Sequence, residues 1–171
     1  MLFPYPLFHL GPALLFGLLL LNYLDLPTFL VASVVVDIEP LLVLSLNLNY
    51  PVHGYLHTFI GGTIVAFFLV LAMSRIRESL RPLMSFFKLE QKVSLRSIVL
   101  ASVFGIYLHI LLDSLIMSDI RPFYPLQSNP LQVHSMFIGF EVYAFCVLLF
   151  VAGGIIYALR MRFRENSLEG E

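Results

Sequence analysis

The chain has 171 residues, of which 59% are hydrophobic and only 12% are charged; its net charge is -1 and its mean hydropathy is +0.90. The charged share is about half of that in soluble proteins, which excludes an ordinary soluble domain. No segment is basic and aromatic enough to indicate a nucleic-acid-binding protein. We therefore predict an all-α, multi-pass integral protein of the cell membrane.

Apolar runs of about 20 residues, long enough to cross a bilayer as helices, recur along the chain. They predict about five transmembrane helices, at about residues 7–23, 27–46, 52–74, 94–117 and 134–159. The first run lacks the basic flank and the small-residue cleavage site of a signal peptide. We therefore expect it to remain as a membrane helix.

The distribution of Lys and Arg predicts how these helices are oriented, because both residues are enriched on the cytoplasmic side of a membrane. Nine of the ten lie in segments 75–96 and 160–164, which a five-helix arrangement brings to one side, and only Arg121 lies opposite. The N-terminus is then outside and the C-terminus cytoplasmic. Segment 75–96 is either a solvated basic loop, which we favour, or an amphipathic helix on the inner leaflet.

Ionisable side chains interrupt the apolar runs at a few places, all in the predicted outer half. They are His9, Asp37 with Glu39, His53 with His57, His109 with Asp113, and His134 with Glu141. A charge at the centre of a membrane helix costs ~2.5–3.5 kcal/mol, so such residues are rarely retained without a partner or a function. The orientation was deduced from Lys and Arg alone, so the gathering of all histidines on one side independently supports a site.

Two of these pairs have a spacing of four residues. His53 and His57 lie in the third predicted helix, and His109 and Asp113 lie in the fourth. Residues four apart share one face of an α-helix. We therefore expect each pair to offer two ligands to one metal ion or to adjacent ions.

The two carboxylates of the second predicted helix are only two residues apart. Asp37 and Glu39 would point to different sides of a regular helix. Pro40 disturbs that helix, because it lacks an N–H and crowds the carbonyl of Val36. The sequence therefore predicts a kink or break that turns both carboxylates inward.

Imidazoles and carboxylates without thiolates suit zinc, manganese or iron. The candidate metal ligands are His9, Asp37, His53, His57, His109 and Asp113. A centre of this kind activates water and holds a phosphoryl or acyl oxygen. Glu39 is a further ligand or the general base that orients the attacking water, and Asp37 is the second candidate catalytic residue.

A proline-rich loop, SDIRPFYPLQSNP at residues 118–130, follows the fourth helix and would cover the outer mouth of the site. Arg121 is the only outer cation. It is the candidate substrate-binding residue for an anionic group, or it forms a local pair with Asp119. Phe123 and Tyr124 are expected at the depth of the lipid headgroups.

These motifs resemble those of the YdjM-like family of membrane-bound, metal-dependent hydrolases. The family carries an early His, an acidic PD-x-[DE] motif, an H-x-x-x-H-[ST] motif, and an H-x-x-x-D motif before a proline-rich segment. This sequence has His9, VDIEP, HGYLHT and LHILLDSLIMSDIRPFYP in the same order, over about residues 8–130. It departs from the pattern at Val36, where the family has Pro, and at Gly54, where the family has a basic residue.

The resemblance implies one hydrolase-like domain over residues 1–171, with zinc as the expected metal. The family is distantly similar to zinc-dependent phospholipase C and P1-type nucleases, which implies a phosphoester of a lipid or lipid-linked molecule as the substrate. One alternative is a proton or metal-ion transporter, because intramembrane histidines and carboxylates also form relays. The other is a non-catalytic membrane protein with a structural metal site.

Overall fold

The computed structural model describes residues 6–169, and side chains within residues 7–163. This range is helical and contains no β-strand. The α-helices are α1 (Leu10–Leu19), α2 (Leu26–Ala32), α3 (Ile38–Ser45), α4 (Phe59–Ile76), α5 (Arg81–Phe86), α6 (Leu95–Ile116) and α7 (Ile138–Glu169). Short 3-10 turns lie at Pro6–His9, Val35–Asp37, Tyr55–His57 and Arg77–Leu80. The predicted all-α class is confirmed.

Four helical segments of the described chain are long and apolar enough to cross a membrane. They are Leu26–Ser45, Phe59–Phe86, Leu95–Ile116 and Ile138–Phe163, and a shorter apolar segment, Leu7–Leu19, precedes them. The chain is therefore a multi-pass membrane protein, as predicted. The first segment is shorter than the predicted run 7–23, because the chain turns after α1 and Asp25 then caps α2 by accepting the N–H of Thr28.

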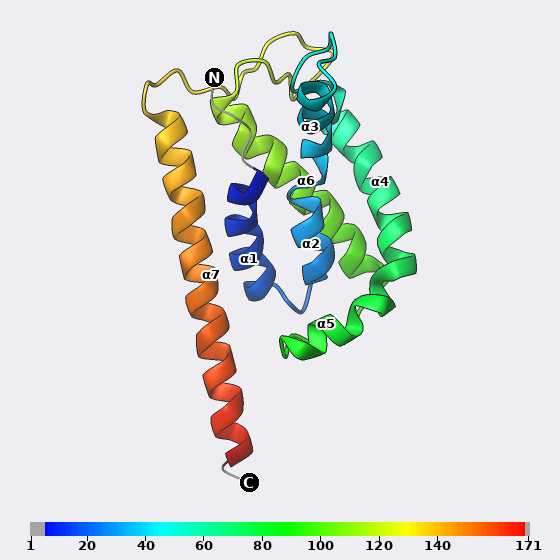
Figure 1. Ribbon diagram of the computed structural model, residues 1–171, viewed down its shortest axis with the longest axis vertical. Helices are drawn as coiled ribbons and strands as arrows, with labels where there is room; N and C mark the ends of the chain where they lie inside the picture. Colours follow the sequence, from blue (N-terminus) through cyan, green and yellow to red (C-terminus); the bar gives the residue numbers. More distant parts are fainter. Residues whose placement is uncertain (1–5, 170–171) are drawn as a thin grey trace.

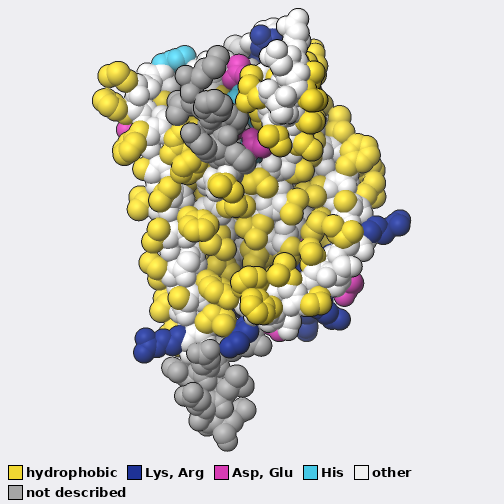
Figure 2. Space-filling view, in the orientation of Figure 1, with side chains coloured by type: hydrophobic (Ala, Val, Ile, Leu, Met, Phe, Trp, Pro, Cys, Tyr) yellow, Lys and Arg dark blue, Asp and Glu magenta, His cyan; other side chains and the backbone are white. Residues whose placement is uncertain are grey.

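Helix α6 occupies the centre of the bundle (Figure 1). Helices α2 and α4 pack against it, whereas α7 packs mainly against α1. Ile106 and Ile110 of α6 are fully buried in the largest apolar cluster, together with Met73 of α4. Large apolar side chains cover much of the outer surface, as a lipid-facing surface requires (Figure 2).

The third predicted helix begins later than its hydrophobic run indicates. We predicted a start at residue 52, but α4 begins at Phe59, after Thr58 caps it by accepting the N–H of Gly61 at 2.9 Å. His53 therefore lies in a loop and His57 in a 3-10 turn. The prediction that they share one helical face is wrong, because the backbone N–H groups of this loop bind a carboxylate instead of helix carbonyls.

The second predicted span is broken, as the sequence indicated. Helix α2 ends at Ala32, the 3-10 turn Val35–Asp37 follows, and α3 begins at Ile38. Pro40 lies in the first turn of α3, where its missing N–H costs nothing. Asp37 and Glu39 are both buried, so the break turns both carboxylates into the protein as expected.

The basic segment 75–96 is not a solvated loop. Arg77 is buried and binds Asp25, while Met84 and Leu89 pack into an apolar cluster beneath α1 and α2. Gln91 donates hydrogen bonds to the carbonyls of the turn between α1 and α2. The segment therefore folds as a cap over one end of the bundle, and it includes the short helix α5.

The contact between α1 and α7 depends on a glycine. A Cβ atom at Gly11 would lie 2.0 Å from the backbone oxygen of Cys146 on α7, and backbone atoms cannot move aside without separating the helices. Gly11→Ala should therefore lower the free energy of unfolding by about 1–3 kcal/mol, as overpacking does. Thermal unfolding in detergent, followed by circular dichroism, measures this loss. Gly154→Ala is the control, because a Cβ atom there meets nothing within 4 Å; equal stability of both variants would contradict the prediction.

Candidate metal centre

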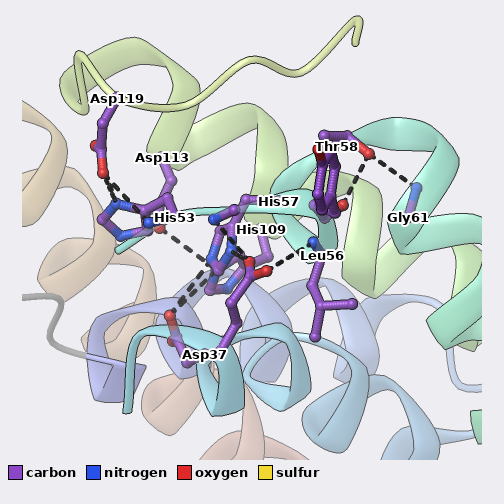
Figure 3. A network of polar contacts seen from close by, with 12 residues as sticks. Asp37, His53, Leu56, His57, Thr58, Gly61, His109, Asp113 and Asp119 are labelled. Carbon is purple, nitrogen blue, oxygen red and sulfur yellow. Dashed lines mark hydrogen bonds and ion pairs between the residues drawn. The ribbon is translucent and has the colours of Figure 1, made fainter. Parts of the chain in front are cut away.

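Four buried side chains from separate parts of the chain meet at one end of the bundle. Asp37 comes from the break between α2 and α3, His57 from the turn before α4, and His109 and Asp113 from α6. One ligand atom from each lies within 4.8 Å of the others. Figure 3 shows these side chains pointing toward one another. Four of the six predicted metal ligands therefore form one cluster.

The atoms that face the middle of this cluster lack ordinary partners. Among the residues that the structure describes, Nε2 of His57, Nε2 of His109 and both carboxylate oxygens of Asp37 are buried without a hydrogen bond. Leaving such an atom unpaired costs about 1–3 kcal/mol. The unpartnered atoms therefore point to a ligand that satisfies all of them together.

The separations between these atoms suit a cation. Nε2 of His57 lies 3.8 Å and Nε2 of His109 lies 3.5 Å from Oδ1 of Asp37, while Nε2 of His109 lies 3.4 Å from Oδ2 of Asp113. All three exceed the ~2.7–3.2 Å of a good hydrogen bond. Imidazole nitrogens and carboxylate oxygens are the donor set that zinc, manganese or iron accepts. The residues present therefore fit a divalent metal ion.

The other ring nitrogen, Nδ1, of His57 and of His109 contacts an oxygen atom on the side away from the centre of the cluster. Nδ1 of His57 lies 2.9 Å from Oε2 of Glu39, and Nδ1 of His109 lies 2.7 Å from the carbonyl oxygen of Ser33. That carbonyl is free because the helix breaks after α2. An Nδ1–H that donates to an oxygen leaves the Nε2 lone pair for a metal. Both imidazoles are thus oriented as metal ligands.

Glu39 holds the loop that precedes α4 as well as His57. Its two carboxylate oxygens accept the backbone N–H groups of Gly54 at 2.9 Å and Leu56 at 3.2 Å, and the hydroxyl of Tyr50 at 3.3 Å. Glu39 therefore lies behind His57 as a positioning residue. Its roles as a further ligand or as the general base stay predictions.

The charges of the cluster also favour a cation. Asp37, Glu39 and Asp113 bring three buried carboxyl groups together. Burial lowers the pKa of the His57 imidazole, but the carboxylates of Asp37 and Glu39 raise it to about 9. The site therefore attracts positive charge, which a proton on His57 or a metal ion can provide.

His9 joins the cluster at its edge. It ends the 3-10 turn before α1, and its Nε2 lies 3.1 Å from Oδ1 of Asp113. Its ring lies against that of His109, with 3.9 Å between the ring centroids. Nδ1 of His9 is buried and has no hydrogen-bond partner in the described part of the chain. The structure thus brings the predicted N-terminal ligand next to the α6 pair.

His53 lies beside the cluster and is held by a residue that the sequence analysis missed. Its Nδ1 lies 3.0 Å from both carboxylate oxygens of Asp119, and its N–H donates to Oδ2 of Asp119 at 3.2 Å. Its buried Nε2 has no partner within the described residues, and its ring centroid is 4.8 Å from that of His57. Burial raises the pKa of Asp119, but the contacts with His53 lower it overall.

The loop after α6 covers this end of the site, as predicted. The carbonyl of Pro122 accepts the N–H of Phe59 at 2.8 Å, which fixes the loop to the start of α4. Arg121 donates to Gln127 and not to Asp119. Arg121 and His53 line the same pocket of about 450 Å³. The residue predicted to contact the substrate therefore lies in a pocket that adjoins the cluster at His53.

The last of the predicted ionisable pairs, His134 and Glu141, lies away from the cluster. His134 and Glu141 are both exposed, and His134 precedes α7 instead of lying within it. His134 lines a separate hollow with Gln132 and Phe140. The structure does not bring either residue to the cluster.

Glu39→Gln should weaken metal binding about 10–100-fold, as the loss of an outer-shell partner does. A glutamine loses the negative charge that orients His57, and its amide N–H₂ group opposes the backbone N–H of either Gly54 or Leu56, which bind different carboxylate oxygens. A competition titration against a chelator measures the dissociation constant. Glu141→Gln, an exposed position on α7, is the control. An unchanged constant in Glu39→Gln would show that the carboxylate does not support the ligand.

A sequence model of the family described as YdjM inner membrane protein matches residues 6–168. No curated protein and no solved structure matches the chain significantly.

Proposed function

The chain belongs to the YdjM inner membrane protein family, and from this premise we propose that it is a metal-dependent hydrolase of the cell membrane. Its substrate would be a phosphoester in a lipid or lipid-linked molecule. The observation that carries the proposal is the convergence of unpartnered imidazole nitrogens and carboxylate oxygens beside a pocket that Arg121 lines. A site with perturbed ionisable groups next to such a pocket is the usual setting of catalysis.

The metal would be zinc in the first place, with manganese or iron as alternatives. Its ligands would be the four clustered side chains Asp37, His57, His109 and Asp113. His9 and His53 flank them, each with one unpartnered ring nitrogen in the described region, and would be additional ligands. When bound, such an ion lowers the pKa of water and polarises a phosphoryl oxygen.

The side chains around the cluster have separate tasks in this proposal. Glu39 and Asp119 orient His57 and His53 through their Nδ1 atoms. Both carboxylate oxygens of Asp37 lack a hydrogen-bond partner among the described residues, so one could bind the ion while the other accepts the proton of an attacking water. Glu39, which the His57 imidazole separates from the centre of the cluster, is the alternative base. Arg121 at the pocket would bind the anionic group of the substrate.

The proposed orientation places the cluster at the outer face of the membrane. Basic side chains gather at the end with α5 and the lower part of α7, whereas the visible histidines lie at the opposite end (Figure 2). Lys and Arg favour the cytoplasmic side. The cluster would then lie at the depth of the outer headgroups, where a lipid phosphoester is accessible.

The test is hydrolysis of phospholipids in mixed micelles by purified, metal-reconstituted protein, with products identified by mass spectrometry. We expect cleavage of a phosphoester bond, and a loss of at least ~100-fold in rate in Asp37→Asn, as for removal of a catalytic acid–base group. Glu141→Gln, a carboxylate-to-amide change at an exposed position away from the cluster, is the matched control. Stoichiometric metal without cleavage of any lipid phosphoester would support the structural-metal alternative, and metal movement into proteoliposomes would support the transporter.

A further inference from the structure

The pocket beside the metal centre is large enough for a small molecule or a lipid headgroup. Its volume of about 450 Å³ lies within the ~300–1,000 Å³ of known ligand sites. Its walls come from the loop before α4 and the loop after α6, and they include His53 and Asp119. The ring centroid of His53 is 4.8 Å from that of His57 in the cluster. Only the His53 imidazole therefore separates an occupant of the pocket from His57.

The charges of the pocket walls favour an occupant without net charge. Arg121 and Asp119 are the lining residues with formal charges, and these charges are opposite; the Asp119 carboxylate also contacts the His53 imidazole in the same wall, 3.0 Å away. The other polar groups of the lining, such as Thr58, Ser118 and Gln127, are neutral. A dianionic phosphate would leave negative charge uncompensated, whereas a molecule with one anionic and one cationic group balances both walls.

Three tyrosine rings supply a surface for the cationic group. The ring centroids of Tyr50 and Tyr55 are 6.2 Å apart, and those of Tyr55 and Tyr124 are 5.2 Å apart with an edge-on arrangement. The hydroxyl of Tyr50 donates to Glu39 and accepts the N–H of Tyr55, which fixes that ring. Aromatic faces attract ammonium groups, and sets of such rings bind them in other proteins.

The surroundings of the pocket indicate a lipid in place of a free metabolite. Phe123 and Leu126, in the same loop as Arg121, are 44% and 51% exposed. Tyr55 in the pocket wall is also more than half exposed. Apolar and aromatic side chains exposed beside polar groups are typical of the headgroup region of a membrane. A lipid could place its headgroup in the pocket and keep its chains against these residues.

We propose that this pocket binds the zwitterionic headgroup of an amine-bearing phospholipid, with the phosphate at Arg121 and the ammonium against the tyrosines. The proposal deepens the proposed function, because this phosphate would be the group presented to the metal centre. Binding itself depends only on the residues of the pocket. It can therefore be measured without turnover.

The experiment compares two lipids that differ only in the headgroup, and one soluble probe that keeps the headgroup without the acyl chains. Full-length protein in a non-ionic detergent is titrated calorimetrically with short-chain phosphatidylethanolamine, with short-chain phosphatidylglycerol and with soluble glycerophosphoethanolamine. We expect the zwitterionic lipid to bind about 10-fold more tightly than the anionic lipid. Tyr124→Leu should remove this preference, and Arg121→Gln should weaken both lipids. The exposed Tyr23 and Arg162 at other positions supply the controls Tyr23→Leu and Arg162→Gln.

Equal or tighter binding of the anionic lipid would overturn the proposal, as would binding that neither pocket variant alters. Soluble glycerophosphoethanolamine that binds as tightly as the lipid would overturn the assignment to a membrane lipid. Repeating the titration with Asp37→Asn separates this proposal from the hydrolase. If this variant keeps the headgroup preference but cleaves no lipid, the result supports the headgroup-binding pocket independently of the hydrolase. If the wild type cleaves a phosphoester but shows no preference for the zwitterionic lipid, the pocket assignment is overturned and the hydrolase proposal is unaffected.

Discussion

His57→Ala and Asp113→Ala should each abolish the metal binding that we propose for the cluster of Asp37, His57, His109 and Asp113. His57 and Asp113 come from different elements, but each supplies one of the four ligand atoms that lie within 4.8 Å of one another. Losing either leaves an incomplete set around the remaining unpartnered atoms. The affinity should fall by more than the ~10–100-fold that an outer-shell change causes. Elemental analysis of detergent-purified protein, after reloading with zinc, manganese or iron, measures the stoichiometry.

Two exposed residues of the same types provide matched controls. His134→Ala and Glu141→Ala remove an imidazole and a carboxylate that lie away from the cluster, so both variants should keep the metal of the wild type. Metal loss from the controls as well would indicate nonspecific binding. A wild-type protein that binds no metal after reloading would contradict the hydrolase proposal and favour a proton-coupled or purely structural role.

The regular parts of the site could be predicted from sequence because helical spacing fixes them. His109 and Asp113 lie four residues apart on α6, and their side chains meet as expected. Pro40 indicated a break in the second span, and the break turns Asp37 and Glu39 inward. In both cases a local rule of backbone geometry determines which way the side chains point.

The irregular parts could not be predicted, because long-range contacts determine them. The loop that holds His53 and His57 lies at the start of the hydrophobic run that continues into α4, and it is irregular because its N–H groups bind Glu39. Asp119 looked like a local partner for Arg121, but it binds His53, 66 residues earlier. No local sequence signal specifies either contact.

Arg77 is another residue whose role depends on a distant partner, and Arg77→Ala should be among the most destabilising substitutions in the chain. Its Nε donates to Oδ1 of Asp25 at 2.6 Å, and the two residues are only 4% and 1% exposed. Removing the arginine leaves a buried carboxylate without its counter-charge. Breaking a buried pair in this way costs about 3–5 kcal/mol. Chemical unfolding in detergent measures the loss.

Arg81→Ala is the comparison that separates burial from charge. Arg81 is also in the basic segment, but it is mostly exposed and lies 3.7 Å from the exposed Glu78, so its loss should cost only about 0–1 kcal/mol. The double variant Asp25→Asn/Arg77→Met should recover part of the stability lost in Arg77→Ala, because it leaves no uncompensated charge. If Arg77→Ala is as mild as Arg81→Ala, Arg77 acts only as a determinant of membrane orientation, as its sequence context alone suggests. If it is severe, the same residue also joins the cap to the start of α2.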